Sequence, residues 1–140
     1  MNEDRLKHSI AVARKMVELA RYYQLTDKEV EACFVIGYHH DIGYEFASDG
    51  IKHNIIGGLI LKNSHFKYWK EVYYHGDPKA SYQSLYLDIL NMADMQIDKY
   101  GNDVGYEKRL EDIKMRYGAA SQVYQNCQEL ITILKNKNND

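Results

Sequence analysis

A chain of 140 residues with 45% hydrophobic and 27% charged side chains can bury a core of its own without disulfides. Its formal net charge of −2 lacks the basic excess of proteins that bind a nucleic-acid backbone, so no nucleic-acid partner is expected. Two cysteines, Cys33 and Cys127, provide neither a disulfide framework nor a cysteine-based zinc motif. No run approaches the roughly 20 apolar residues that span a bilayer, and the N-terminus MNEDRLKHSI is charged, so we expect a cytoplasmic protein without membrane contact.

Long stretches of helical periodicity and a single proline predict an all-α fold, a bundle of about six to seven helices. The first predicted helix runs from Asp4 to about Tyr23, and its inward stripe is expected to contain Leu6, Ile10, Ala13, Val17 and Ala20. His8 lies about 200° from Leu6, on a second apolar side, which aims it inward as well. Thr26 and Glu29 form a capping box for a second helix through about Asp41, and Gly43 fits its stop.

The remaining elements follow from the same periodicity and from turn residues. We expect a loop at Tyr44–Gly50, a frayed tail at Lys135–Asp140, and helices at Ile51–Asn63, Phe66–Tyr74, Tyr82–Tyr100, Tyr106–Tyr117 and Ser121–Leu134. The inward side of the last helix is expected to hold Val123, Cys127, Leu130, Ile131 and Leu134. There is no repeat or linker, so residues 1–140 are interpreted as one domain, with a core at about 5–100 and C-terminal helices at about 106–135.

A histidine beside an aspartate at the end of an apolar helix is the feature that points to chemistry. A buried carboxylate needs a partner, and imidazole and carboxylate side by side suit a divalent cation. His40 shares a helix side with Cys33 and Ile36, which makes it the candidate ligand with Asp41. His39 is rotated by about 100° from His40 and is interpreted as a core residue or a neighbour of the ligands.

Further imidazoles and one carboxylate fall on apolar faces or at a helix end. His53 shares a face with Gly57, His75 stands before the Gly-Asp-Pro helix stop, and Asp94 interrupts an apolar stripe. His65 falls in a polar break and is expected to be exposed without a metal role. The inward candidates are therefore His8, His40, Asp41, His53, His75 and Asp94. Each alone could be a hydrogen-bonded core residue, but six together indicate a metal site.

The order of these residues resembles the HD-domain superfamily of metal-dependent phosphohydrolases. The family pattern is a histidine on the first helix, a His-Asp pair closing a later helix and a distant aspartate. These match His8 in "LKHSIAVA", His40-Asp41 in "HHDIGY" and Asp94 in "NMADMQID". The resemblance covers roughly residues 5 to 100, and "YEKRLEDIKMRYG" also looks like the tail of small bacterial HD proteins, without adding chemistry. It implies an all-α HD fold and hydrolysis of a phosphate ester or anhydride.

The positions of two more histidines resemble those in the HD subgroup with dinuclear metal centres. In the HD-GYP phosphodiesterases and the bacterial symmetrical diadenosine tetraphosphate hydrolases, two histidines stand between the pair and the last aspartate, as His53 and His75 do here. The resemblance implies that His8, His40, Asp41 and Asp94 hold one metal, that His53 and His75 hold a second, and that Asp41 bridges both. With no thiolate ligand, two ions of iron, manganese, cobalt, nickel or zinc would fit.

Motifs of some HD subgroups are missing from this sequence, and their absence disfavours the reactions of those subgroups. No "GYP" signature follows, which disfavours cyclic-dinucleotide hydrolysis, and the Glu-Asp pair of guanosine tetraphosphate hydrolases is missing. The first hypothesis is a metal-activated water attacking a small phosphorylated substrate, expected to be a nucleotide, with Asp41 as the catalytic residue. The alternatives are a diiron oxygenase on the HD fold and a non-catalytic module that binds metal or nucleotide.

Some expectations concern groups around the metal site. Candidate phosphate-binding groups near the mouth are Lys52, Lys79, Tyr44 and Tyr74. The aromatic stretch Phe66 to Tyr74 would suit a homodimer interface as well as a core.

Overall fold

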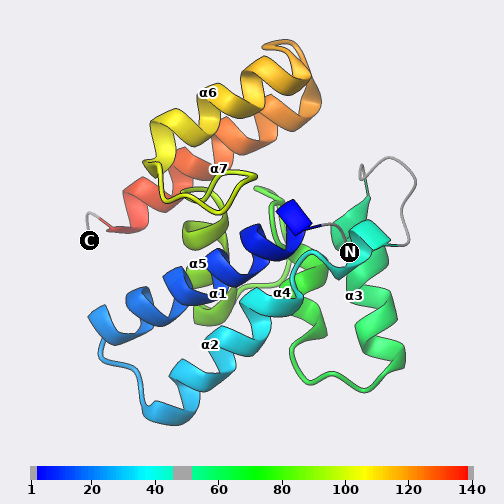
Figure 1. Cartoon of the computed structure of the whole chain (residues 1–140), viewed down its shortest axis with the longest axis vertical. Helices are drawn as coiled ribbons and strands as arrows, with labels where there is room; N and C mark the ends of the chain where they lie inside the picture. Colours follow the sequence, from blue (N-terminus) through cyan, green and yellow to red (C-terminus); the bar gives the residue numbers. More distant parts are fainter. Residues whose placement is uncertain (1–2, 46–51, 139–140) are drawn as a thin grey trace.

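The structure, a computed structural model, describes residues 3–45 and 52–138, and within these ranges it contains helices and no strand (Figure 1). The all-α prediction is confirmed. In chain order the elements are α1 (Glu3–Tyr22), α2 (Asp27–His39), the 3-10 helix η1 (Ile42–Glu45), α3 (His53–Asn63), α4 (Trp69–Tyr74), α5 (Leu85–Asp94), α6 (Gly105–Tyr117) and α7 (Gln122–Asn138). None of the described helices is both long and apolar enough to cross a bilayer.

The main core lies where α1, α2 and α5 meet. In Figure 1, α1 runs beside α2, and α6 and α7 form a hairpin on the other side of α1. Apolar side chains from all three helices fill the space between them, among them Val12, Met16, Cys33, Ile36, Ile89 and Leu90. Burying several such side chains, at about 1.5–3 kcal/mol each, fixes the relative positions of these helices.

The buried side of α1 is not the stripe that we expected. Leu6 is 39% exposed, whereas His8, Val12 and Met16 are buried. Ala13 and Ala20 are buried as expected. Both α2 and α5 contact α1, so the protein interior faces the second apolar side of this helix. The consequence is that His8 is directed inward together with the core residues that follow it at helical spacing.

The start of α2 confirms the predicted capping box. The Thr26 hydroxyl accepts a hydrogen bond from the Glu29 N–H, and the Glu29 carboxylate accepts one from the Thr26 N–H. The helix ends at His39, two residues before the predicted end, and Gly43 lies inside η1. A Cβ at Gly43 would lie 1.8 Å from the backbone oxygen of His53, so only glycine allows η1 to approach α3 this closely.

Several other predicted boundaries are wrong. The helix predicted at Phe66–Tyr74 begins only at Trp69, and the one predicted at Tyr82–Tyr100 is limited to Leu85–Asp94. Ser84 caps α5 by accepting a hydrogen bond from the Leu87 N–H, and the chain turns at Met95. Tyr44 and Glu45 belong to η1, while the rest of the predicted loop and Ile51 lie outside the described residues.

The C-terminal helix continues through most of the tail that was expected to fray. It extends to Asn138, and the last two residues lie outside the described ranges. The Lys135 ammonium pairs with Glu107 of α6, and the Lys137 ammonium lies 2.9 Å from the Asp88 carboxylate of α5. Of the predicted inward residues, Val123 is 36% exposed, while Cys127, Leu130, Ile131 and Leu134 are buried against α5 and α6.

Candidate metal centre

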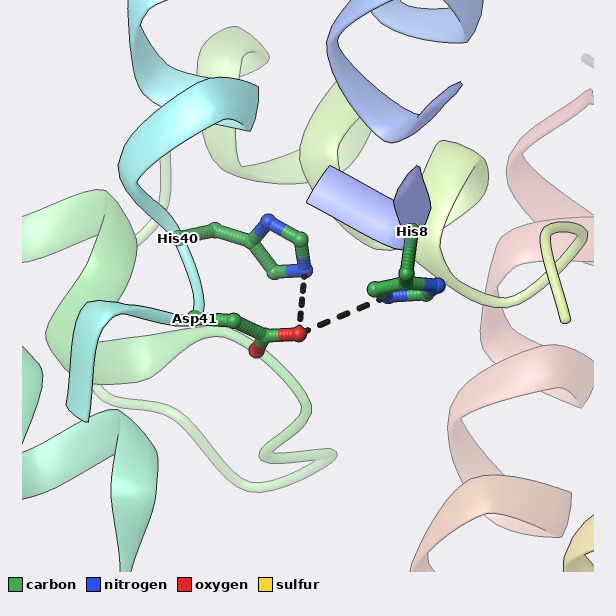
Figure 2. Close-up of side chains that lie close together, drawn as sticks. All are labelled: His8, His40 and Asp41. Atoms are coloured by element: carbon green, nitrogen blue, oxygen red, sulfur yellow. Dashed lines mark ion pairs between the residues drawn. The ribbon is translucent and has the colours of Figure 1, made fainter. Parts of the chain in front are cut away.

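The structure brings all six predicted ligand residues to one place. His8 comes from α1, His40 and Asp41 follow α2, His53 begins α3, His75 follows α4, and Asp94 ends α5. Only His53 is not buried, and 22% of its side chain is exposed. In Figure 2, His8 and His40 approach Asp41 from two different helices. The packing of the helices therefore brings together residues that are far apart in the sequence.

One side of the cluster joins two imidazoles to two carboxylates. Nε2 of His8 lies 3.0 Å from Oδ1 of Asp94 and 3.5 Å from Oδ2 of Asp41. Nε2 of His40 lies 3.4 Å and 3.2 Å from the same two oxygens. We call these four residues the first half-site. All four potential ligand atoms surround one small volume in the interior.

The other oxygen of Asp41 faces a second pair of imidazoles. Its Oδ1 atom lies 3.3 Å from Nε2 of His53 and 3.7 Å from Nε2 of His75. These two nitrogens are 3.2 Å apart. We call Asp41, His53 and His75 the second half-site. Asp41 is therefore shared, with one carboxylate oxygen directed to each side.

The backbone fixes which ring nitrogen of three histidines carries a proton. In each of them Nδ1 lies at hydrogen-bond distance from a backbone carbonyl, which can only accept. The pairs are His8 with Asp98 at 2.8 Å, His40 with Gly37 at 2.7 Å, and His75 with Val72 at 2.6 Å. In a neutral ring, Nε2 then carries the lone pair and is free to bind a metal. Metal-binding histidines usually have this arrangement, with the other ring N–H donated to a protein oxygen.

The lone pairs of His8 and His40 face carboxylate oxygens, which cannot donate to them. A carboxylate oxygen only accepts, so an Nε2 lone pair beside it requires a second ring proton or a cation between the two. The Nε2 atom of His40 is buried and makes no well-aligned hydrogen bond, although two carboxylate oxygens lie within 3.4 Å of it. An orphaned buried nitrogen among carboxylates is the environment that a divalent cation satisfies. The residues present therefore fit a metal ion.

Three triplets within the described residues have ligand atoms close enough for one ion. Two of them, His8-His40-Asp41 and Asp41-His53-His75, lie within the two half-sites. The third, His40-His75-Asp94, contains residues from both. The half-sites are therefore contiguous. Imidazole and carboxylate are the only ligand types in these triplets, a set that suits zinc, iron, manganese, cobalt or nickel.

The charges of this cluster are strongly coupled. Burial would lower the pKa of His40, but the Asp41 and Asp94 carboxylates raise it well above its ordinary value. Burial would raise the pKa of Asp41 and Asp94, but the His40 imidazolium holds both well below the usual range. Burial lowers the pKa of His75. The raised pKa of His40 favours its protonated form, with which a metal ion would compete for Nε2.

The two remaining histidines do not join the cluster. His39 is partly exposed, its Nδ1 atom lies 2.8 Å from the Val35 carbonyl, and its ring packs against Phe66. It is thus neither a core residue nor a neighbour of the ligand atoms. His65 is exposed, as expected. Cys33 and Cys127 are buried free thiols, and burial raises the pKa of Cys127 to about 11.

A cavity opens beside the cluster and has two lobes. Both are lined by a shared set of five residues, His8, Asp41, Tyr44, Arg109 and Arg116. The neutral lobe, of about 390 Å³, adds side chains such as His53, His75, Ile113, Tyr117 and Asn126. The basic lobe, of about 210 Å³, adds Asp4, Arg5 and Lys99. Figure 1 places α6, which carries both arginines of the shared set, above the start of α1.

The groups that the sequence suggested for phosphate binding mostly lie away from the two lobes. Tyr44 lines both lobes, but Lys52, Lys79 and Tyr74 line neither. The basic residues at the cavity are Arg5, Lys99, Arg109 and Arg116. Arg109 donates from Nε to the Asp94 carbonyl at 3.1 Å, and its Nη2 atom lies 3.9 Å from Oδ1 of Asp94. The stretch "YEKRLEDIKMRYG", which was expected to add no chemistry, thus contributes two arginines to the site.

A comparison of the sequence with models of protein families identifies the family of this chain. The model of the HD domain matches residues 5–112, which is most of the chain. The chain belongs to the HD domain family. HD domains are typical of metal-dependent hydrolases and bind divalent metals. The family match includes α6, so it extends beyond the segment in which the sequence resemblance lies. Comparisons with curated proteins and with solved structures found no match to this HD domain protein.

Proposed function

We propose that this HD domain protein is a phosphohydrolase with a dinuclear metal centre that cleaves a phosphoester or phosphoanhydride bond of a small substrate such as a nucleotide. The observation that carries the proposal is the position of Asp41, whose two carboxylate oxygens face different pairs of histidines. A carboxylate shared in this way suits two adjacent ions. The first ion would be held by His8, His40, Asp41 and Asp94, and the second by Asp41, His53 and His75.

Two divalent ions supply Lewis acidity when bound, since they acidify a water molecule and neutralise charge on phosphoryl oxygens. The protein's part is to position the reacting groups. Asp41 lines both lobes of the cavity, so it would orient a water for attack on a phosphorus atom beside it. Hydrolysis then adds this water across the P–O bond and releases an alcohol or a phosphate as the leaving group. Arg109 holds Asp94 in place from outside the cluster.

The test is hydrolysis of bis(p-nitrophenyl) phosphate, p-nitrophenyl phosphate and a panel of nucleotides by protein loaded separately with manganese, cobalt, nickel, zinc or iron. We expect release of nitrophenol or phosphate with at least one metal. Asp41→Asn should remove this activity, because the amide cannot bridge two cations. Tight nucleotide binding without turnover, or oxygen consumption by the iron form without phosphate release, would contradict the proposal.

A further inference from the structure

The two lobes of the cavity differ in charge although they share five lining residues, among them the candidate ligands His8 and Asp41. Beyond the shared set, the basic lobe adds two cations, Arg5 and Lys99, against one acid, Asp4. The neutral lobe adds no lysine or arginine, and it adds Asp77 and Asp94. A ligand that spans both lobes would therefore meet a more positive environment in the basic lobe than in the neutral lobe.

The four cations of the basic lobe come from three separate segments. Arg5 is on α1, Lys99 lies between α5 and α6, and Arg109 and Arg116 are on α6. A single exposed lysine or arginine is ordinarily only solvated. Here, in contrast, four cations from different segments line one cavity next to the ligand cluster. The four cations outnumber the two carboxylates of this lobe, Asp4 and Asp41, so an anion between them would be stabilised.

Two of these cations are held by residues of the site. The Arg5 guanidinium lies 3.3 Å from the centre of the Tyr44 ring, and this ring stacks on His53 with centroids 4.2 Å apart. Arg109 contacts Asp94. Both positions are therefore fixed relative to the candidate ligands, and they form the inner part of the basic lobe.

The other two cations, Lys99 and Arg116, are exposed. Among the described residues, neither forms an ion pair with a carboxylate. Each lies over a neighbouring tyrosine ring, at 5.0 Å for Lys99 and 5.8 Å for Arg116. Their charge is thus available to a ligand in the lobe, where guanidinium and ammonium groups are effective partners for phosphoryl oxygens.

We propose that the basic lobe binds a second phosphoryl group of the substrate, so that the protein prefers ligands with two or more linked phosphoryl groups over monophosphates. The inference rests on the proposed function, because the first phosphoryl group would lie at the metal centre. The volume of about 210 Å³ is below the roughly 300–1,000 Å³ of a site for a whole small molecule, and so suits part of a ligand. The larger lobe, with Ile113, Tyr117 and Asn126, would receive the organic part.

The test compares binding of inorganic phosphate and pyrophosphate to metal-loaded protein by isothermal titration calorimetry. The variant carries Lys99→Gln and Arg116→Gln, two exposed positions whose change should leave the fold intact. The control carries Arg14→Gln and Lys114→Gln, which remove the same charge at exposed positions on α1 and α6 that line neither lobe. We expect wild type and control to bind pyrophosphate at least about tenfold more tightly than phosphate, and the variant to lose this preference.

Two results would overturn the inference: equal affinity of the wild type for both anions, or an unchanged preference in the Lys99/Arg116 variant. An unchanged preference in the variant would mean that the metal ions alone select pyrophosphate by chelation. Chelation by the metal ions would act equally in the wild type, the variant and the control. Hydrolysis is measured separately on the same preparations. A pyrophosphate preference that depends on Lys99 and Arg116 in a protein without hydrolytic activity would support the basic lobe and count only against the proposed function.

Discussion

The Nε2 atoms of His53 and His75 lie 3.2 Å apart, and Oδ1 of Asp41 lies within 3.7 Å of both. If an ion binds at the second half-site, His53→Ala should remove it, because only two of its three ligands, Asp41 and His75, would remain. The first half-site would keep all four of its residues and its ion. We expect the metal content to fall from about two ions per chain to about one, measured by plasma mass spectrometry. The exposed His65→Ala variant is the control and should keep the wild-type content. Unchanged content in His53→Ala would disprove the second half-site.

His40→Ala is expected to abolish both metal retention and hydrolysis. His40 is completely buried between two carboxylates, so its loss removes a ligand and leaves Asp41 and Asp94 facing each other. The neighbouring His39→Ala change alters a partly exposed ring outside the cluster and should leave both properties intact. Circular dichroism of both variants checks that they fold. If His39→Ala or His65→Ala were as damaging as His40→Ala, the ligand assignment would be wrong.

The metal-free protein should lose stability as the pH rises, and the stabilisation by bound metal should increase over the same range. Burial disfavours the charged form of His40, yet Asp41 and Asp94 raise its pKa well above 6.5. This group therefore stabilises the metal-free fold fully below pH 6.5, and the contribution is lost as the pH rises through the raised pKa. Asp41 and Asp94 stay ionised over this range, because their pKa values are well below 3.8.

An ion must displace the His40 proton, so its apparent affinity should increase as the pH rises above about 6.5. Thermal unfolding with chelator and with manganese, between about pH 6 and 9, measures both trends. The melting temperature with chelator should decrease with pH, and the increase caused by manganese should become larger. A manganese effect that is constant over this range would contradict a protonated His40 in the metal-free protein.

Gly37→Ala should destabilise the contact between α1 and α2. An added Cβ would lie 2.6 Å from Cα of Ala13 and 2.9 Å from its backbone nitrogen, and backbone atoms cannot rotate away. Overpacking of this kind costs about 1–3 kcal/mol in the free energy of unfolding, which guanidinium denaturation measures. It also separates the helices that carry His8 and His40, so metal affinity should fall. Glu31→Ala, on the exposed side of α2, should change stability by less than about 0.5 kcal/mol. Equal stability of the two variants would argue against the close contact.

The sequence predicted the helices with clear local signals. The capping box of Thr26 and Glu29 placed the start of α2, and the apolar stripe around Leu90 and Asp94 identified α5. The ends of α3, α4 and α6 agree with the prediction, but both ends of α5 and the start of α4 do not, because tertiary contacts determine them. The chain leaves α5 at Met95, and three residues further the Asp98 carbonyl accepts a hydrogen bond from His8. No local pattern specifies a contact across that sequence distance.

The six candidate ligands could be identified because a buried imidazole or carboxylate conflicts with an apolar stripe. The basic lobe could not, since arginines such as Arg116 have the ordinary spacing of a solvated helix face. Only the fold, in which α6 lies above the start of α1 in Figure 1, brings Arg116 to the same cavity as Arg5. Lys52 and Lys79, which are near the ligands in the sequence, line neither lobe.

The metal content of the protein purified without added metal or chelator is the most direct test of the dinuclear centre. Plasma mass spectrometry on protein of known concentration gives the number of transition-metal ions per chain. The arrangement of two half-sites around Asp41 predicts close to two ions. One ion or none per chain, with no increase after incubation with manganese, iron, cobalt, nickel or zinc, would contradict it.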